Sequence, residues 1–290
     1  MKPPVFEYYD PRTLDEALAL LGQWGGDAKV LAGGQSLVPL LNFRLVKPRA
    51  LVDINRIPEL AYVRQVDNAV AFGACARQSA VASSPEVARL CPLLGEVLPF
   101  VGHAATRNRG TVVGSIAHAD PAAEFAVVAT ALEAELEARS AQGARTLRPE
   151  EFFVSYFTTA LEPTELLAEV RFPALGPRTG WGFLEVSRRH GDFAVVAAVS
   201  VVALDAQGHC QRVRVALGGV GGTPVRARAV EEALTGARPT PEALAKAADL
   251  VRREVEPESD VHASAEYRRE VAAVLVRRTL QAAVERVDAR

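Results

Sequence analysis

The apolar pattern at the start of the chain predicts a capped helix. An apolar stripe at helical spacing begins at Leu14, directly after Thr13, whose hydroxyl can accept a hydrogen bond from a free N–H of the first turn. Glu16 stands where a capping box needs a carboxylate. Gly25-Gly26 predicts the end of this helix.

Short β-rich runs then predict strands. They cover residues 28–32, which run into Gly33-Gly34, and residues 51–54. Two further runs, 63–66 and 70–73, flank Asp67-Asn68 and predict a hairpin.

The middle of the chain has weaker periodicity. It predicts a helix over residues 87–101 that is interrupted at Pro92, a loop over 106–120, helix or strand over 124–134, and a strand over 166–172 that Pro173 ends.

A stretch rich in glycine and proline, residues 174–180, is the best linker candidate. After it the pattern predicts three strands, 182–187, 193–204 and 212–217, then one helix starting at Thr240-Pro241 and another over about 265–287. The order of elements is therefore α+β, with a first domain over residues 1–175 (subdomains about 1–55 and 56–175) and a second over 176–290.

Composition narrows the class of protein. The 290 residues are 49% hydrophobic and 23% charged, which is typical of a globular protein with a proper core. The net charge of −2 gives no basic excess for a nucleic-acid partner. No secretory signal and no run of about 18 apolar residues is present, so we expect a protein that does not span a membrane. The isolated Cys75, Cys91 and Cys210 predict neither disulfides nor an iron–sulfur cluster within the chain, and they favour the cytoplasm.

The first candidate for chemistry is the turn Ala32-Gly33-Gly34-Gln35-Ser36. Backbone N–H groups in a tight glycine turn can approach a pyrophosphate closely, and Ser36 adds a hydroxyl donor. A helix after Ser36 would favour an anion further. Such a turn is more often only a turn, so by itself it is weak evidence for phosphate binding.

The second candidate is the string from Arg107 to Glu124, RNRGTVVGSIAHADPAAE. It combines hydroxyls at Thr111 and Ser115 with carboxylates at Asp120 and Glu124 that suit ribose or ribityl hydroxyl groups. A capped surface loop is the plainer interpretation of this string taken alone.

Both strings resemble one known family. Residues 31–45, LAGGQSLVPLLNFRL, are similar to the first flavin loop of the medium subunit of aerobic carbon monoxide dehydrogenase, a subunit type found across the xanthine dehydrogenase group of molybdenum hydroxylases. Residues 107–124 resemble the second flavin loop of that family. Residues 185–196 and 217–227 resemble two segments of its C-terminal domain, so four collinear matches span nearly the whole chain.

The resemblance implies a vanillyl-alcohol-oxidase-type (PCMH-like) FAD-binding domain of two α+β subdomains, followed by a smaller α+β domain with a three-stranded sheet and helices. It implies an FAD-dependent electron-transfer subunit. A large partner subunit would carry the molybdenum cofactor and a small partner subunit the [2Fe-2S] clusters, in a heterotrimer that dimerises. Electrons would pass from the clusters through FAD to an external acceptor.

The resemblance also implies the cofactor-binding residues. They are Val30, Leu31, Ala32, Gly33, Gly34, Gln35, Ser36, Leu37, Val101, Thr111, Gly114, Ser115, Asp120, Glu124 and Leu167. A lysine that contacts the cofactor in some relatives is replaced here by Leu184-Glu185.

One residue departs from the second family loop. That loop has two adjacent glycines, and this chain has Val113-Gly114. A β-branched residue at a position of positive φ costs about 1–3 kcal/mol, so Val113 either points away harmlessly or weakens FAD binding. We expect binding to be retained.

No catalytic side chain and no metal site are expected. The five histidines show no ligand spacing, and His103 and His118 near the second loop fit hydrogen-bonding roles better than proton transfer. Two alternatives stay open: a self-contained FAD-dependent oxidase or reductase, and a degenerate scaffold subunit that has lost FAD.

Overall fold

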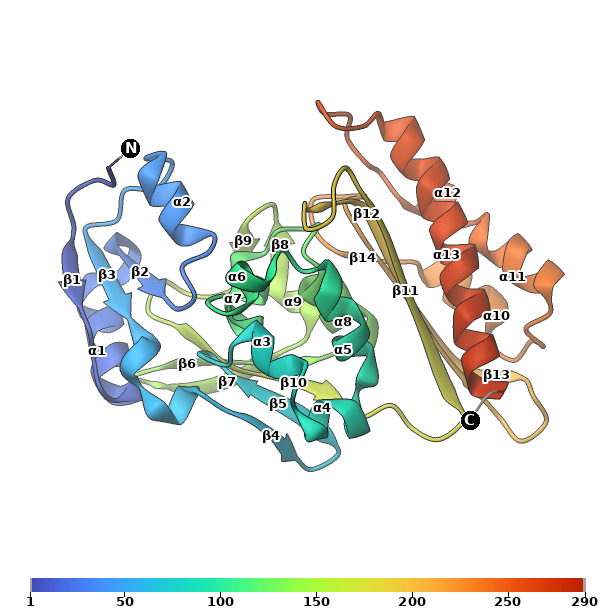
Figure 1. Ribbon diagram of the computed structural model, residues 1–290, viewed down its shortest axis with the longest axis horizontal. Coiled ribbons are helices and arrows are strands. Elements are labelled where there is room, and N and C mark those ends of the chain that lie inside the picture. The colour runs from blue at the N-terminus through green and yellow to red at the C-terminus, as the bar shows by residue number, and fades with distance from the viewer. Residues whose placement is uncertain (1, 289–290) are drawn as a thin grey trace.

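A computed structural model describes residues 2–288 (Figure 1). Three larger sheets follow one another in chain order, and β8 and β9 form a separate two-stranded sheet. An N-terminal parallel sheet has the order β1-β3-β2, a central antiparallel sheet the order β4-β5-β10-β6-β7, and a C-terminal antiparallel sheet the order β11-β12-β13-β14. The expected α+β class, with two α+β subdomains before a smaller α+β domain, is confirmed.

The N-terminal region contains the capped helix that the sequence predicts. Its elements are β1 (Glu7–Tyr9), α1 (Leu14–Trp24), η1 (Gly25–Asp27), β2 (Ala28–Leu31), α2 (Leu37–Asn42), β3 (Ala50–Asp53) and η2 (Ile54–Arg56). Thr13 caps α1 by accepting from the Glu16 N–H at 3.2 Å. The Glu16 carboxylate accepts from the Arg12 N–H at 2.7 Å, one residue upstream of the position that a capping box requires.

The central region contains the predicted hairpin, with Asp67 at φ 49°, and the predicted helix break at Pro92. Its elements are η3 (Pro58–Leu60), β4 (Val63–Val66), β5 (Ala69–Gly73), α3 (Gln78–Val81), α4 (Pro85–Leu90), α5 (Pro92–Val97), η4 (Leu98–Phe100), α6 (Ala104–Arg107), α7 (Val112–His118), α8 (Glu124–Leu132), β6 (Glu135–Ser140), β7 (Gly143–Leu147), α9 (Pro149–Phe152), β8 (Phe153–Ser155), β9 (Thr158–Thr159) and β10 (Leu166–Pro173).

The expectation of a loop over residues 106–120 is wrong, because this segment contains the end of α6 and all of α7. The Thr111 hydroxyl caps α7 by accepting from the Gly114 N–H at 2.9 Å. The buried side chains of α7 are those of Val112, Val113 and Ile116. A helix of two turns is too short for its apolar stripe to stand out among glycine and asparagine.

The C-terminal region has four strands, so the expected three-stranded sheet is corrected. Its elements are β11 (Thr179–Ser187), β12 (Ala194–Leu204), β13 (Cys210–Gly218), β14 (Val225–Arg226), α10 (Arg228–Leu234), α11 (Pro241–Ala248), α12 (Val251–Glu254) and α13 (Ala265–Asp288). The two-residue β14 and the short α10 and α12 carry too few residues to give a periodic signal.

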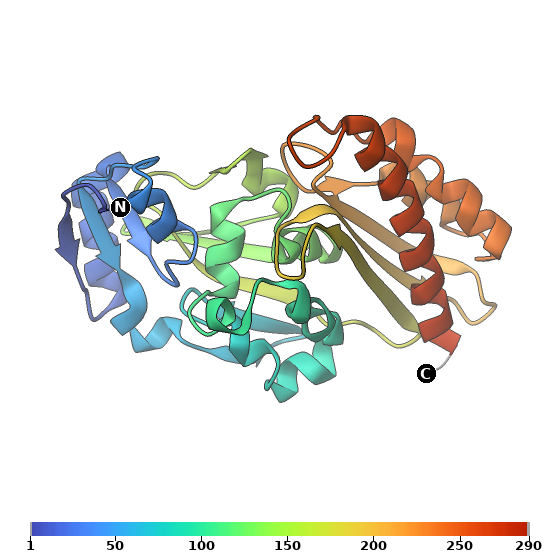
Figure 2. The ribbon, with the colours of Figure 1, turned by 45° about the horizontal axis from the view of Figure 1, so that its top comes forward.

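The C-terminal sheet is covered on both faces, which explains the continuous apolar run of β12. Alternate residues of β12 belong to different cores: Ala197 and Val199 pack with the central region, whereas Val196 and Ala198 pack with the C-terminal helices. Helix α13 lies along the face of β11 and β12 (Figure 2), and α8 of the central region contacts β12 and β13.

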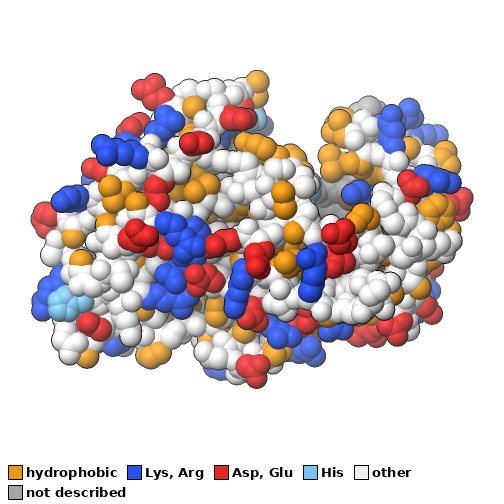
Figure 3. Space-filling view, turned by 180° about the vertical axis from the view of Figure 1, so that it is seen from behind, with side chains coloured by type: hydrophobic (Ala, Val, Ile, Leu, Met, Phe, Trp, Pro, Cys, Tyr) orange, Lys and Arg blue, Asp and Glu red, His pale blue; other side chains and the backbone are white. Residues whose placement is uncertain are grey.

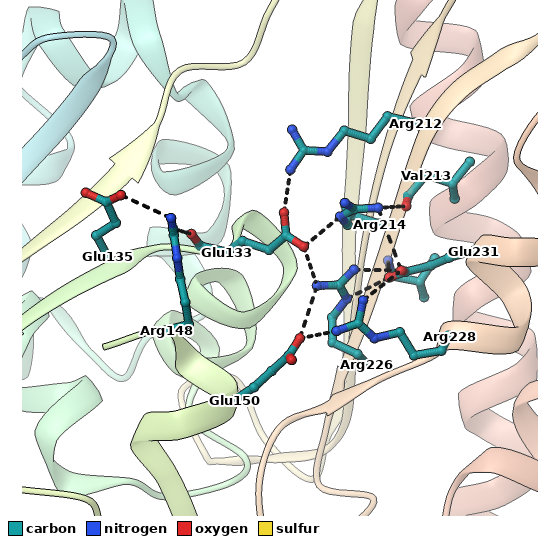
Figure 4. Close-up of polar contacts among 11 residues, drawn as sticks. Glu133, Glu135, Arg148, Glu150, Arg212, Val213, Arg214, Arg226, Arg228 and Glu231 are labelled. Atoms are coloured by element: carbon teal, nitrogen blue, oxygen red, sulfur yellow. Dashed lines mark hydrogen bonds and ion pairs between the residues drawn. The ribbon is translucent and has the colours of Figure 1, made fainter. Parts of the chain in front are cut away.

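An ion-pair network joins the central and C-terminal regions (Figure 4). Glu133, directly after α8, contacts Arg212 at 2.6 Å, Arg214 at 3.1 Å and Arg226 at 3.1 Å. Arg226 also pairs with the buried Glu231 at 2.6 Å. Glu133 follows α8 of the central region, whereas its arginine partners belong to β13 and β14 of the C-terminal sheet. The network therefore fixes the C-terminal sheet against α8.

Candidate functional site

The two candidate loops lie against each other although about 75 residues separate them in sequence. A Cβ atom built on Gly33 would lie 2.5 Å from the Arg109 carbonyl oxygen and 2.7 Å from the Gly110 Cα. A Cβ atom built on Gly114 would lie 4.0 Å from the Ala32 Cβ. The loop after β2 therefore faces α6 and α7 directly (Figures 1 and 2).

The two positions of the first loop that hold glycine, 33 and 34, require it for different physical reasons. Gly34 has φ +71°, a conformation that side chains with a Cβ rarely adopt. Gly33 is required because the backbone of the second loop occupies the space of its missing side chain. The sequence predicts the approach of a pyrophosphate as the reason for glycine here, whereas in the structure the backbone of the second loop fills the space beside Gly33.

The first loop presents unused hydrogen-bond donors. Within residues 2–288, the backbone N–H groups of Gly33, Gly34, Gln35 and Ser36 have no hydrogen-bond acceptor. Ser36 precedes α2, but its hydroxyl makes no capping hydrogen bond. Gly33, Gly34 and Ser36 are half-buried, and Gln35 is exposed. Figure 3 shows a hollow in the surface between the N-terminal region and the rest of the molecule. Four consecutive free N–H groups next to a left-handed glycine form a site suited to an anion.

In the second loop, the structure gives Thr111 a role within the chain. Thr111 is 2% exposed and its hydroxyl oxygen is used as the cap of α7. Ser115 in the next turn is half-buried. A Cβ on Gly114 would lie 2.6 Å from the Thr111 hydroxyl, so this position needs glycine for the cap to form.

Val113 lies inside α7 with ordinary helical backbone, and its side chain is 1% exposed. It packs in the core with Val112 and Ile116. Positive φ is not needed at this position. The strain that a β-branched residue would suffer there does not arise.

Two carboxyl groups, those of Asp120 and Glu124, lie at the C-terminal end of the second loop, and within residues 2–288 neither pairs with a lysine or an arginine. Glu124 is the first residue of α8 and is 4% exposed; burial, with a contribution from Asp120, raises its pKa to about 7. Burial also raises the pKa of Asp120, whose Oδ1 accepts from the Ala122 N–H at 2.9 Å. Such groups are suited to accept hydrogen bonds from hydroxyl groups of a ligand.

Glu185 on β11 brings a further acid toward Glu124 from the C-terminal region. Burial, and then the charge of Glu124, raise the pKa of Glu185 to about 8. Its Oε2 atom is buried and has no hydrogen-bond partner in the described part of the chain. Two acids that share one environment and lack a cation favour the protonated form.

The remaining predicted site residues are apolar and differ in accessibility. Val30 and Leu31 end β2 and are half-buried. Val101 is buried beside Gly102, where the chain turns at positive φ. Leu167 on β10 is 2% exposed and belongs to the core of the central region. The structure therefore groups the two loops and the acids, and it leaves Leu167 inside the central core.

Two residues that the sequence analysis did not identify connect the loops. The side chain of Arg77 reaches the carbonyl of Arg109, and the side chain of Asn55 reaches the carbonyl of Ala32. Neither residue belongs to a recognisable motif. Asn55 follows β3 and Arg77 precedes α3, and it is the fold that brings these two positions together.

No group of three or more histidine, cysteine or acidic residues suited to a metal ion occurs in residues 2–288. The three cysteines are buried and unpaired, as the sequence predicts. None of the described helices combines the length and the apolar character needed to cross a bilayer.

Comparison with known proteins defines the class. Residues 4–175 match the family model for the FAD binding domain in molybdopterin dehydrogenase, and residues 181–283 match that for the CO dehydrogenase flavoprotein C-terminal domain. The protein is thus a flavoprotein subunit of the oxidoreductase class, with FAD as its cofactor. It belongs to the FAD-binding medium subunits of molybdenum hydroxylases.

The relatives cover the whole length of the chain. It is 44% identical to the 6-hydroxypseudooxynicotine dehydrogenase complex subunit alpha of Paenarthrobacter nicotinovorans, over 99% of this chain and 97% of the relative. It is 38% identical to the carbon monoxide dehydrogenase medium chain of Hydrogenophaga pseudoflava, over 98% of both.

Among solved structures, carbon monoxide dehydrogenase from Hydrogenophaga pseudoflava, in the form that lacks the Mo-pyranopterin moiety of the molybdenum cofactor, matches with a TM-score of 0.95. The sequence identity is 40%, and the match covers 99% of each chain. The resemblance to the carbon monoxide dehydrogenase medium subunit that the four motifs predict is confirmed.

Proposed function

We propose that this chain relays electrons through FAD, from [2Fe-2S] clusters in a small partner subunit to an external acceptor. Substrate is oxidised at a molybdenum cofactor in a large partner subunit. The three chains form a heterotrimer that dimerises in the cytoplasm. The unpaired, buried cysteines of this chain support clusters housed in another subunit.

One observation carries the assignment of the pyrophosphate to the first loop. Four consecutive backbone N–H groups, Gly33 to Ser36, have no acceptor in the described part of the chain and lie beside the second loop. A pyrophosphate carries two negative charges and accepts several hydrogen bonds at once, so it suits this donor set.

The carboxyl groups support a role at the other parts of the cofactor. Among the described residues, no lysine or arginine pairs with Glu124, Glu185 or Asp120. They are acceptors for the ribityl or ribose hydroxyl groups of FAD, and their burial excludes water from the contact. The residues that we assign to the cofactor are those that the sequence analysis named, with Glu185 added.

We assign residues 1–175 to FAD binding and residues 176–290 to the C-terminal domain. FAD, when bound, supplies the redox chemistry, and the chain positions it and sets its electrostatic surroundings. No side chain of this chain is required as general acid or base.

The test is purification of the full chain with and without its partners. The isolated chain is expected to be yellow, with FAD close to one per chain, and to show no turnover of substrate by itself. Co-expressed with its neighbouring genes, it is expected to purify with a molybdenum-cofactor subunit and a [2Fe-2S] subunit. A colourless chain that takes up no added FAD contradicts the proposal, and turnover by the isolated chain favours a self-contained oxidase.

Val113 supplies the test of a scaffold that has lost FAD. Because its side chain is buried in the core, Val113→Gly is expected to leave FAD affinity within about twofold while lowering the free energy of unfolding by about 3 kcal/mol, through cavity formation and the low helix propensity of glycine. A marked gain in FAD affinity would favour the degenerate scaffold.

A further inference from the structure

A chain of side chains connects the two flavin loops. The Arg77 guanidinium donates from Nη1 to the Arg109 carbonyl at 2.5 Å and from Nη2 to the Asn55 Oδ1 at 2.5 Å. The Asn55 Nδ2 donates in turn to the Ala32 carbonyl at 2.7 Å. One carbonyl of each loop is therefore held through Arg77 and Asn55.

Asn55 is fixed on the side of the first loop. The Asp53 Oδ1 accepts from the Asn55 N–H at 2.9 Å and from its Nδ2 at 2.6 Å. The Tyr8 hydroxyl donates to the Asp53 Oδ2 at 2.6 Å. Because Asp53 ends β3 and Tyr8 lies in β1, Asn55 is anchored to the N-terminal sheet.

Arg77 is fixed on the side of the second loop. The Gln78 N–H donates to the Gly110 carbonyl at 2.9 Å, and the Val112 N–H donates to the Ala76 carbonyl at 3.1 Å. The backbone around Arg77 therefore follows the second loop. Its side chain reaches from there toward the N-terminal sheet, which only a long, forked donor can do with two acceptors at once.

We propose that Arg77 is a positioning residue that sets the separation of the two flavin loops through Asn55, and that this separation determines how well the pyrophosphate of FAD is bound. The inference rests on the proposed function. Both Arg77 hydrogen bonds named here end on atoms of this chain, so its effect on FAD is exerted through the loops.

The experiment measures the FAD dissociation constant of the full chain, depleted of flavin, by titration with FAD. Removing a hydrogen bond of a charged donor from a site of this kind changes an equilibrium by about 10- to 100-fold, so Arg77→Ala and Asn55→Ala are each expected to weaken FAD binding by that factor. Arg77→Lys keeps the charge without the fork and is expected to fall between Arg77→Ala and the wild type.

The double variant separates positioning from general destabilisation. Since Arg77 acts through Asn55, the double variant is expected to bind FAD no more weakly than the weaker single variant. Arg145→Ala is the matched control, because Arg145 lies on the edge strand β7 and makes hydrogen bonds to Glu165 and to the Ala160 carbonyl. Its FAD dissociation constant is expected to stay within twofold of wild type.

Hydrogen exchange of the flavin-free chain gives a readout that does not depend on FAD. The hydrogen-bonded amides of Val38, Asn55 and Gln78, which lie at the two loops, are expected to exchange faster in Arg77→Ala, whereas those of α13 are expected to be unchanged. If Arg77→Ala does not fold, Arg77→Lys and Asn55→Ala decide by the same criteria.

The outcomes are distinct. Wild-type chain that takes up no FAD overturns the proposed function and this inference with it. Wild-type chain that binds FAD, with single variants within twofold of it or with fully additive losses in the double variant, overturns the inference about Arg77 alone.

Discussion

Helix α8 has a glutamate at each end, and the two occupy opposite surroundings. Glu124 opens the helix, is buried, and has a pKa raised to about 7 by burial. Glu133 comes directly after the last residue of α8. Burial by itself would raise the pKa of Glu133. The hydrogen bond from Arg226 and the charges of Arg214, Arg226 and Arg212 outweigh burial and lower this pKa to about 2.

The helix dipole predicts the reverse order. It favours a negative charge at the N-terminus, where Glu124 lies, and disfavours one at the C-terminus, where Glu133 lies. Burial without a cation outweighs the dipole at one end, and three arginines outweigh it at the other. The difference teaches that Glu133 finds its partners within the chain, whereas Glu124 is buried without a lysine or arginine partner among the described residues, which suits the contact with FAD that we propose.

The largest expected effect is at the Glu133 end. Glu133→Ala leaves the buried Arg226 with fewer acceptors, so it is expected to lower the free energy of unfolding by about 2–3 kcal/mol. Urea unfolding of the flavin-free chain measures this. Glu135→Ala, which removes only an exposed pair with Arg148, is the control and is expected to cost about 0.5 kcal/mol or less. Equal losses in the two variants would show that the network does not join the regions.

The next largest effect concerns FAD binding, which is expected to depend on Glu124 and not on Glu133. Glu124→Gln keeps the shape and replaces one carboxyl oxygen with an amide NH2 group, so it is expected to weaken FAD binding about tenfold, because one acceptor for a hydroxyl group of the cofactor is lost. The thermal midpoint of the flavin-free chain is expected to be unchanged or higher, because an uncompensated acid is removed from the interior.

Glu133→Gln is the matched control at the other end of α8. It is expected to lower the stability of the flavin-free chain and to leave FAD affinity within about twofold, since its partners are arginines of this chain. Loss of FAD affinity in both variants, or in neither, would contradict the contrast between the ends.

The smallest effect is a pH dependence. The folded pKa of Glu185, about 8, lies above the ordinary value of 4.5, so the folded state holds a proton that the unfolded state releases. Stability is therefore fully present below pH 4.5 and declines as the pH rises toward 8. Glu185→Gln is expected to flatten the fall in thermal midpoint of the flavin-free chain between pH 5.5 and 8, measured by circular dichroism.

Glu256→Gln, at an exposed position, is the control for this titration and is expected to follow the wild type. A Glu185→Gln curve parallel to the wild-type curve would show that Glu185 is not held in the protonated form.

Much of the fold was readable in the sequence where elements are long or bounded by strong signals. The α1 helix after Thr13, the hairpin at Asp67-Asn68 and the break at Pro92 are such cases. The short helices around 106–118 and the two-residue β14 were missed, because their stability comes from packing and caps rather than from local periodicity.

In the candidate site too, some residues could be predicted from the sequence and others only from the fold. Gly33-Gly34 and the second loop were recognisable as strings of residues. Asn55 and Arg77 were not, because an arginine gains this role only when the fold places two acceptors within reach. Glu185 was noted only as a replacement, and its proximity to Glu124 depends on how the C-terminal sheet packs against α8 through β12 and β13.

The sequence by itself determined the family, the cofactor and the order of the domains, since these depend on collinear motifs and on hydrophobic patterning. Only the tertiary structure decided what each residue does. It showed that Gly33 makes room for Arg109 and Gly110, that Val113 lies harmlessly in the core, and that Glu124 and Glu133 have opposite surroundings. The physical reason is that space, desolvation and charge pairing act between residues far apart in the chain, and no local pattern records them.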